Sequence, residues 1–402
     1  MKRKKRRKVK REIKITTTLV CIILLVFAGI LYTKTFKNNS SNVKDNDNKV
    51  IKALKKEENI KKIKLLATGD GLIHSVIFKS YQNANGGFDF TPALSDVKDI
   101  VSDYDIAYYN QETPMGDATL DYSGYPRFYV PKEFGDAMMD AGFNTVSLAS
   151  NHSLDRGEAG ILQTVKYYKT TNLLYNGIND SKEMRNNYII KEKNGITYTL
   201  LSYTTLTNGL SVPAGKDYLL NIYDEEKVKE DIKNVRDKVD VLIVAMHWGE
   251  EYQSSPNDSQ KQIAKTLTDA GVDIIIGNHP HILQPITKIN DTIVMYSLGN
   301  FISNQYGNDD YNKLVGFMAT LDITKKDKEI IIDNLGGEMI FTKYDGNPLT
   351  TAVHSNHKVI PFSKMTDNRY LNDYERIYNK YADVLKSYGE NINITPIGRS
   401  VN

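Results

Sequence analysis

Short apolar runs alternate with segments of helical spacing along most of the chain from Ile63 onward. Strands are predicted for the apolar runs at residues 63–67, 105–109, 144–148, 241–245, 272–276 and 292–297. Helices are predicted for the segments with helical spacing at residues 91–104, 131–141, 155–170, 225–238, 259–270 and 368–388. Strands are also expected near residues 316–323 and 329–332, and a hairpin over residues 188–203 that turns at Asn194-Gly195. This alternation is typical of an α/β domain in which a largely parallel or mixed sheet is covered by helices.

An uncharged apolar segment precedes this domain. Residues 15–32 are eighteen residues without charge, rich in Leu, Ile and Val, which is close to the ~20 residues that cross a bilayer. Ten Lys or Arg lie in residues 1–14, so the positive-inside tendency places that segment in the cytoplasm. We therefore predict a transmembrane anchor at residues 15–32, a solvated tether at residues 33–60, and a cell-membrane location with the main domain outside the cell.

A cleaved signal peptide and a lipoprotein are the two competing interpretations of residues 15–32. The apolar run is longer than the core of a usual signal peptide, and its small residues Ala28 and Gly29 lie inside it. A lipoprotein would need small residues directly before Cys21, where Leu19 and Val20 stand. An uncleaved anchor is therefore favoured.

The rest of the chain is long enough for one large domain with appendages. We predict a domain at residues 61–350, followed by a C-terminal extension at residues 351–402 that contains the last helix. The part from Ile63 onward carries a net charge of about −11, although the whole chain carries +3. Proteins bind nucleic acid mainly through Lys and Arg that neutralise phosphates, so nucleic acid is not expected as a partner.

Polar residues of similar type follow successive predicted strands. They are Asp70, Glu112, Asn151-His152, His247 and His279-Pro280-His281. Taken singly, each is explained as well by a turn, a helix cap or a buried histidine. In open α/β sheets, however, sites form at the carboxyl ends of neighbouring strands, so one shared polar site is predicted. Because proline favours an extended residue before it, His279 and His281 are expected to present both rings on one face.

The ligand types in this set are carboxylate, amide oxygen and imidazole, without thiolate. Such a set suits Mn²⁺, Fe or Zn²⁺, and this many ligands suit two divalent metal ions. A two-metal site can stabilise the oxygens of a displacement at phosphorus or carbonyl, so hydrolysis is the implied chemistry. His152 is then a candidate to protonate a leaving group, and Arg156 a candidate to neutralise an anionic substrate.

Six motifs stand in order between residues 63 and 325. They are Gly69-Asp70, Asn110-Gln-Glu112, Ala149-Ser-Asn-His152 with Asp155 and Gly157, His247-Trp-Gly-Glu-Glu-Tyr252, Gly277-Asn-His-Pro-His281 and Tyr296-Ser-Leu-Gly-Asn-Phe301. This ordered set resembles the CapA family of poly-γ-glutamate capsule synthesis proteins.

The resemblance implies the fold of calcineurin-like metallophosphoesterases, a four-layer α/β/β/α sandwich with a two-metal site. It implies His152 as the general acid and, as metal ligands, Asp70, Glu112, Asn151, His247, His279 and His281. Two positions depart from the phosphoesterase pattern. Leu72 stands where that pattern has a histidine, with His74 two residues further on, and Glu112 replaces the usual bridging Asp. Both departures bear on the number of metals and on phosphatase activity.

Three hypotheses of function follow. The first is a membrane-anchored, metal-dependent hydrolase that helps to make, export or attach poly-γ-glutamate at a bacterial surface. The second is a non-catalytic scaffold that binds this or another anionic polymer, or membrane synthetase subunits. The third is a surface phosphoesterase unrelated to polymer. The sequence contains no phosphate loop of the Gly-x-x-x-x-Gly-Lys type, so ATP-driven polymerisation is assigned to a partner. An acidic domain repels a polyanion unless basic residues gather locally.

Overall fold

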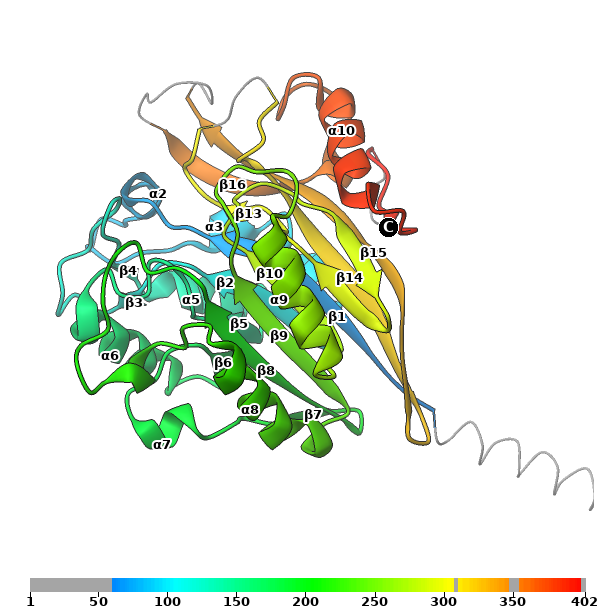
Figure 1. Cartoon of the computed structure of the whole chain (residues 1–402). Coiled ribbons are helices and arrows are strands. Elements are labelled where there is room, and N and C mark those ends of the chain that lie inside the picture. Colours follow the sequence, from blue (N-terminus) through cyan, green and yellow to red (C-terminus); the bar gives the residue numbers. More distant parts are fainter. Residues whose placement is uncertain (1–59, 307–309, 347–353, 399–402) are drawn as a thin grey trace, which may run out of the picture. The chain divides into compact units, whose positions relative to one another are not determined.

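The computed structural model of the chain describes residues 60–306, 310–346 and 354–398 (Figure 1). The chain divides into two compact units, Met1–Ile60 and Lys61–Asn402, and the second contains the fold. The predicted cytoplasmic segment, the anchor at residues 15–32 and nearly all of the tether lie outside the described residues. Among the helices that are described, none is both long enough and apolar enough to cross a bilayer.

The first sheet is mixed, with a parallel half and an antiparallel half. Its strand order is β16-β15-β14-β1-β2-β5-β6, with β13 paired to β1 and β17 paired to β15. The bounds are β1 Ile60–Gly71, β2 Ile106–Gln111, β5 Thr145–Ser147, β6 Leu174–Asn176, β13 Asn300–Ile302, β14 Val315–Lys326, β15 Glu329–Asp345, β16 Ser355–Pro361 and β17 Asn393–Ile394. Strands β1, β2, β5 and β6 run parallel, whereas β14, β15 and β16 pair antiparallel. The prediction of a mixed sheet is therefore confirmed.

The second sheet has the order β11-β12-β10-β9-β8-β7. Its strands are β7 Lys191–Lys193, β8 Ile196–Thr204, β9 Val241–His247, β10 Ile274–Asn278, β11 Ile286–Ile289 and β12 Thr292–Met295. The four inner strands are parallel, and both edge strands are antiparallel to their neighbours. The predicted hairpin is present between β7 and β8, and both turn residues, Asn194 and Gly195, have positive φ of 49° and 73°, as a two-residue hairpin turn requires.

The two sheets pack face to face, and helices cover their outer faces (Figure 1). Successive side chains of a strand point to opposite faces, so Leu65 of β1 lies in the core between the sheets while Leu66 packs outward. Outside the first sheet lie α5 (Glu133–Asp140) and α6 (Gly157–Tyr168). Outside the second lie α8 (Glu225–Val235) and α9 (Asp258–Asp269). The described residues thus form layers in the order helices, sheet, sheet, helices.

Local sequence explains where these helices begin. At α9 the side chain of Asn257 accepts a hydrogen bond from the backbone N–H of Gln260, and the Gln260 side chain accepts one from the backbone of Asn257. This capping box satisfies two of the backbone donors that a helix start leaves unpaired. Asp224 caps α8 in a similar way through the backbone N–H of Lys227.

The helix predicted over residues 91–104 is wrong as a single helix. The structure has two short helices instead, α3 (Thr91–Leu94) and α4 (Lys98–Ser102). Ser95 and Asp96 between them are weak helix formers, and the Asp96 carboxylate forms ion pairs with Lys358 in the middle of β16 and with Lys364 just beyond that strand. The remaining short elements are α2 Ser75–Ser80, β3 Met115–Gly116, β4 Val130–Pro131, α7 Lys182–Arg185 and 3₁₀ turns at Asp217–Leu219, Arg236–Lys238 and Phe362–Lys364.

The described residues after 350 contribute two strands and a helix to the same fold. Strands β16 and β17 both pair with β15. Helix α10 (Tyr374–Lys386) places Ile377, Tyr381 and Leu385 in the core that also contains Phe317 of β14. Strand β16 therefore forms the edge of the antiparallel half of the first sheet.

Candidate metal centre

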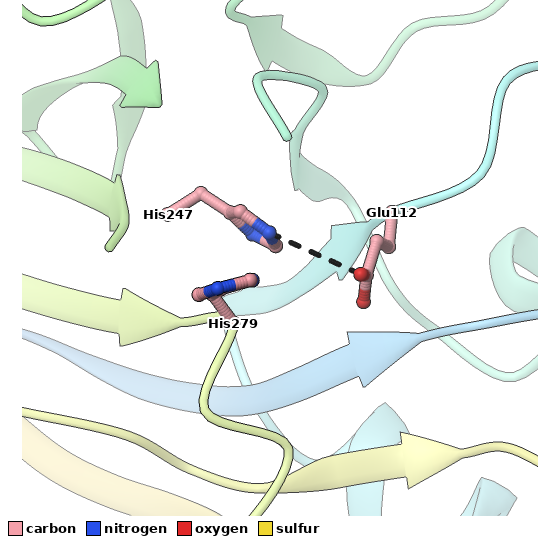
Figure 2. A group of neighbouring side chains, drawn as sticks. All are labelled: Glu112, His247 and His279. Carbon is pink, nitrogen blue, oxygen red and sulfur yellow. Dashed lines mark ion pairs between the residues drawn. The ribbon is translucent and has the colours of Figure 1, made fainter. Parts of the chain in front are cut away.

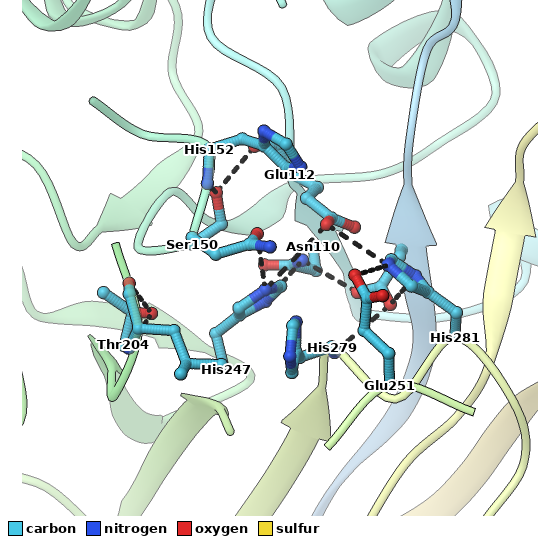
Figure 3. A network of polar contacts seen from close by, with 12 residues as sticks. Asn110, Glu112, Ser150, His152, Thr204, His247, Glu251, His279 and His281 are labelled. Atoms are coloured by element: carbon cyan, nitrogen blue, oxygen red, sulfur yellow. Dashed lines mark hydrogen bonds and ion pairs between the residues drawn. The ribbon is translucent and has the colours of Figure 1, made fainter. Parts of the chain in front are cut away.

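The carboxyl ends of parallel strands from both sheets meet in one buried polar cluster (Figure 3). Asp70 is the penultimate residue of β1, and Glu112 comes directly after β2. His247 is the last residue of β9, and His279 comes directly after β10. Strand β9 pairs with β10 in the second sheet, and β1 pairs with β2 in the first. The position of each side chain is therefore set by the register of a rigid strand.

Three overlapping groups of acidic and histidine side chains have donor atoms within 4.8 Å of one another. They are Glu112 with His247 and His279, Asp70 with Glu112 and His281, and Glu251 with His279 and His281. All of these residues except Glu251 are buried. Glu112 belongs to two of the groups. Its carboxylate therefore lies between His247 and His279 on one side and Asp70 and His281 on the other.

The carboxylate of Glu112 is buried and has no hydrogen-bond partner within the described residues. Both oxygens lie out of contact with solvent, and the closest histidine nitrogens are 3.6 Å away in His281 and 3.9 Å away in His247. Figure 2 shows the contact with His247. Burial raises the pKa of this carboxyl well above its ordinary value. A buried carboxylate is normally paired, because leaving it unpaired costs free energy. The gap between Glu112 and the histidines is therefore a place where a cation would be stabilised.

His281 is held by two oxygen acceptors on one side of its ring. Its Nδ1 lies 3.0 Å from Oδ1 of Asn300 and 3.2 Å from Oδ2 of Asp70. Burial lowers the pKa of His281, but the nearby carboxylates of Glu112 and Asp70 outweigh it and raise the pKa to about 9. The local field thus favours positive charge at the centre of the cluster.

His247 and His279 form the other half of the cluster, with ring centroids 4.8 Å apart. Burial lowers the pKa of His247 well below its ordinary value and that of His279 to about 3. Both rings are therefore neutral at physiological pH, which is the form in which imidazole binds a metal. Nδ1 of His279 is buried and has no partner among the described residues.

The extended backbone predicted for His279-Pro280-His281 is wrong. His279 and His281 have positive φ, 96° and 60°, a conformation that costs free energy in residues other than glycine. The backbone N–H of His279 donates to Oδ2 of Asp70 at 3.2 Å, so a contact with the first sheet holds the turn. The two rings nevertheless lie 5.9 Å apart and both border the cluster.

Asn151 and His152 follow β5 and contact the cluster from the first sheet. Oδ1 of Asn151 lies 3.0 Å from Nε2 of His247. Nδ1 of His152 lies 2.8 Å from Oδ2 of Asp155, which also accepts the backbone N–H of Phe128 at 2.7 Å. The Phe128 ring packs edge-on against the His152 ring at 4.7 Å. His152 is therefore oriented by both a carboxylate and an aromatic ring.

The structure places Arg156 in a different environment from these residues. Its guanidinium donates to the carbonyl of Asp121 at 2.8 Å and to the hydroxyl of Ser123 at 3.0 Å, and it lies 5.8 Å from the ring of Tyr129. These contacts bind the guanidinium to the loop before β4. Its suggested role in neutralising a substrate stays a prediction.

His74 does not replace the histidine that the phosphoesterase pattern has at the position of Leu72. Its Nδ1 lies 3.1 Å from the carbonyl of Leu72 and 3.2 Å from the backbone nitrogen of Asn304. Burial lowers its pKa to about 4. None of the three donor groups found among the described residues includes His74, so the departure seen in the sequence is also present in the structure.

A cavity of about 480 Å³ opens beside the cluster. Its wall includes His152, Glu251 and His281, together with His74, Tyr252 and Lys313. The cavity joins the candidate general acid to the candidate ligands, so a substrate that enters it contacts both.

Three residues of the site were missed by sequence reasoning, although each belongs to a motif named above. Glu251 lies 3.8 Å from Nε2 of His281, and Asn300 holds the other nitrogen of the same ring. Asn110 donates to Oδ1 of Asp70 at 2.9 Å. Glu251 and Asn300 lie within the motifs His247–Tyr252 and Tyr296–Phe301, and Asn110 stands one residue before the end of β2. Their motif membership was the signal that could have identified them.

The donor set of this site can hold a divalent metal ion. Its buried carboxylate, which accepts no hydrogen bond among the described residues, its two neutral histidines and its electrostatic preference for positive charge all match that use. Oxygen and imidazole donors without thiolate suit Mn²⁺, Fe or Zn²⁺.

Fold and site together define an α/β protein with a buried carboxylate–histidine centre at the strand ends. Residues 64–305 match the family model of the bacterial capsule synthesis protein PGA_cap, which is more than half of the chain. The chain therefore belongs to this family, and the resemblance found in its motifs is confirmed.

Two relatives are each 35% identical to this chain. One is the PGA biosynthesis protein CapA of Bacillus subtilis (strain 168), aligned over 176 residues that cover 43% of this chain and 46% of the relative. The other is the capsule biosynthesis protein CapA of Bacillus anthracis, aligned over 178 residues that cover 42% of each chain. The chain thus spans less than half the length of either relative.

Solved structures with a similar fold include the calcineurin-like phosphoesterase YfkN from Bacillus subtilis. The TM-score is 0.44 at 15% identity, covering 82% of this chain and 99% of that one. The NAD nucleotidase NadN of Haemophilus influenzae gives a TM-score of 0.43 at 14% identity, covering 84% of this chain and 65% of that one.

Proposed function

We propose that this protein is a membrane-anchored, extracellular component of capsule biosynthesis that acts on poly-γ-glutamate or another anionic polymer as a metal-dependent hydrolase. The observation that carries the hydrolase proposal is the carboxylate of Glu112, which is buried between two sets of histidines and accepts no hydrogen bond among the described residues. Membership of the capsule synthesis family supports the choice of polymer. The uncharged segment at residues 15–32, preceded by ten basic residues, supports the anchor.

Two divalent ions would share the donor set, with Glu112 between them. Glu112, His247 and His279 would hold one, with Asn151 beside His247. Asp70, Glu112 and His281 would hold the other, with Glu251 as a further donor at the edge of the cavity. Bound metal would supply Lewis-acid polarisation of a carbonyl or phosphoryl oxygen. Oδ1 of Asn300, which accepts a hydrogen bond from Nδ1 of His281, and the Asn110 amide, which donates to Asp70, would fix the orientation of the ligands.

His152 would act as the general acid at the cavity wall. Asp155 occupies Nδ1 of its ring, so Nε2 is the nitrogen that can exchange a proton with a leaving group. A carboxylate bound to Nδ1 keeps the imidazole in one orientation and one tautomer.

The test is elemental analysis of the full-length chain purified in detergent, with hydrolysis assays on a phosphoester and on poly-γ-glutamate. We expect at least one divalent metal ion per chain, and hydrolysis of one substrate that a chelator abolishes and Mn²⁺ or Zn²⁺ restores. A protein that folds but retains no metal at any stage would remove the hydrolase proposal. Hydrolysis of the phosphoester alone would favour a surface phosphoesterase unrelated to polymer.

The anchor has its own test. The full-length chain should sediment with membranes, and external protease should digest the domain from residue 61 onward in intact cells. A chain that lacks residues 1–32 should no longer sediment with membranes. Protection of the domain from external protease would contradict the proposed orientation.

A further inference from the structure

Lys313 lies in the wall of the cavity, and its ammonium has no carboxylate partner in the part of the chain that the structure describes. Its ammonium nitrogen is 3.8 Å from the centroid of the Tyr252 ring and 5.7 Å from that of Tyr306. Within the described residues no carboxylate comes within ion-pair distance of it, and Glu251, which borders the same cavity, lies close to His281 instead. The side chain is partly buried.

Among the described residues, the positive charge of this ammonium has no close counter-charge. Burial lowers the pKa of Lys313, and Glu251 acts in the opposite direction. The face of an aromatic ring stabilises a cation only in part, and a desolvated charge normally has a counter-charge. Because the cavity lies next to the ammonium, an anion bound there would provide that counter-charge.

The position of Lys313 is tied to the candidate metal centre through one asparagine. Nδ2 of Asn300 donates to the backbone carbonyl of Lys313 at 2.8 Å, and Oδ1 of the same side chain lies 3.0 Å from His281. Asn300 also donates to Gln305 at 2.9 Å, and Gln305 donates to the hydroxyl of Tyr252 at 3.3 Å. The Tyr252 ring lies 6.1 Å from the ring of His281. The cation and the metal ligands are therefore held in a fixed relation, with Tyr252 between them.

We propose that Lys313, held over Tyr252, is a specificity-determining residue that binds a carboxylate of the substrate beside the reacting bond. The proposal rests on the proposed function for its substrate, a polymer of anionic residues. In a γ-linked glutamyl chain each residue bears a carboxylate on the carbon attached to the amide nitrogen, so every backbone amide has a carboxylate within two bonds of its nitrogen. A lysine ammonium is a compact charge with three donors, which suits such a group.

A cationic subsite also offsets the electrostatic repulsion between an acidic domain and a polyanion. The residues from Ile63 onward carry about −11, which repels an anionic polymer at long range. A single cation inside a low-dielectric cavity acts more strongly on a bound carboxylate than exposed charges do, because solvent screens those charges. Lys313 would therefore select the carboxylate at the site while the surface stays acidic.

The test compares binding of a fluorescent γ-glutamyl oligomer to the full chain in detergent micelles. We expect Lys313→Met to weaken binding about tenfold or more, since a charged hydrogen bond is lost. Lys313→Arg should stay within about threefold of the natural protein, because the charge is kept. The methyl ester of the oligomer should bind the natural protein and Lys313→Met equally.

Lys328→Met is the matched control. Lys328 is exposed at the turn that ends the 12-residue strand β14, whereas Lys313 stands two residues before that strand begins. The two lysines thus lie beyond opposite ends of β14, about 40 Å apart, and both variants lose the same charge. We expect Lys328→Met to bind the oligomer as the natural protein does.

Three outcomes would overturn the inference: equal binding by Lys313→Met and the natural protein, no binding of the oligomer by the natural protein, or displacement of the oligomer by inorganic phosphate but not by glutarate. Metal content of every variant is measured alongside. Binding that depends on Lys313 in a protein without metal would support the subsite and defeat the hydrolase proposal, so the two failures are distinguishable.

Discussion

Nε2 of His247 lies 3.0 Å from Oδ1 of Asn151, and this contact joins the two sheets at the carboxyl ends of their strands. His247 ends β9 of the second sheet, and Asn151 follows β5 of the first. Both side chains are buried. A hydrogen bond at this distance between a ring nitrogen and a carbonyl oxygen orients the ring. Asn151 therefore fixes the orientation of the His247 ring relative to Glu112.

Asn151→Ala should destabilise the protein and reduce its metal content. The change leaves Nε2 of His247 buried without its partner, which costs about 1–3 kcal/mol. Urea unfolding measures the first effect and elemental analysis the second. Asn208→Ala is the control, because Asn208 contacts the other end of the Asn151 amide at 3.3 Å and leaves the bond to His247 intact. Equal metal content in the two variants would contradict a ligand-positioning role for Asn151.

Glu112→Gln should change stability in opposite directions without and with metal. In the metal-free protein the substitution removes a buried carboxyl that accepts no hydrogen bond among the described residues and whose pKa burial raises well above its ordinary value, so the melting temperature should rise, with a gain of about 1–3 kcal/mol. With Mn²⁺ in excess the natural protein should gain about 2.7 kcal/mol at a hundred times the dissociation constant, and the variant much less. Thermal melts in chelator and in Mn²⁺ measure both effects. A variant that Mn²⁺ stabilises as much as the natural protein would show that Glu112 binds no metal.

The sequence predicted the strands and the polar residues at their ends better than it predicted the loops. Apolar runs such as residues 241–245 indicate buried strands by composition alone, and the motif residue His247 comes two positions after this run. The contact between Glu251 and His281 depends instead on how the loop after β9 folds back, which local propensity does not encode. The positive φ of His279 is likewise set by a tertiary hydrogen bond to Asp70.

A second histidine cluster was not predicted, because its members come from distant segments. His357 of β16 contacts Asn304, which follows β13, at 2.6 Å, and Tyr344 of β15 packs 4.9 Å from the same ring. In the sequence, His354 and His357 follow no apolar strand that marks a site. The pairing of β15 with β16 brings His357 beside Asn304, and His354 lines the cavity.

His357→Gln should flatten the dependence of stability on pH. Burial lowers the pKa of His357 from 6.5 to about 3, so between these values the unfolded chain binds a proton that the folded protein does not. The stability contributed by the neutral ring is therefore fully present above pH 6.5 and is lost as the pH falls. At pH 5 the loss amounts to about 2 kcal/mol relative to pH 7.

Glutamine retains a donor for Oδ1 of Asn304 but does not titrate in this range. Urea unfolding of both proteins at pH 7 and pH 5 measures the difference, and the natural protein should lose more stability than the variant. Parallel losses in the two proteins would show that His357 titrates normally in the fold.

His152→Ala should abolish turnover without removing metal. A general acid contributes about 10²–10⁴-fold to a rate, and His152 is absent from the donor groups found among the described residues. Asp155→Asn should reduce the rate less and shift its pH profile, because the carboxylate that orients Nδ1 of His152 at 2.8 Å is neutralised. Capsular polymer output in cells and hydrolysis by the purified chain are measured for each variant, with metal content and melting temperature as controls. Unchanged polymer output from a folded, metal-loaded His152→Ala protein would reject catalysis and leave the scaffold hypothesis, in which the same cavity binds polymer or synthetase subunits without cleaving a bond.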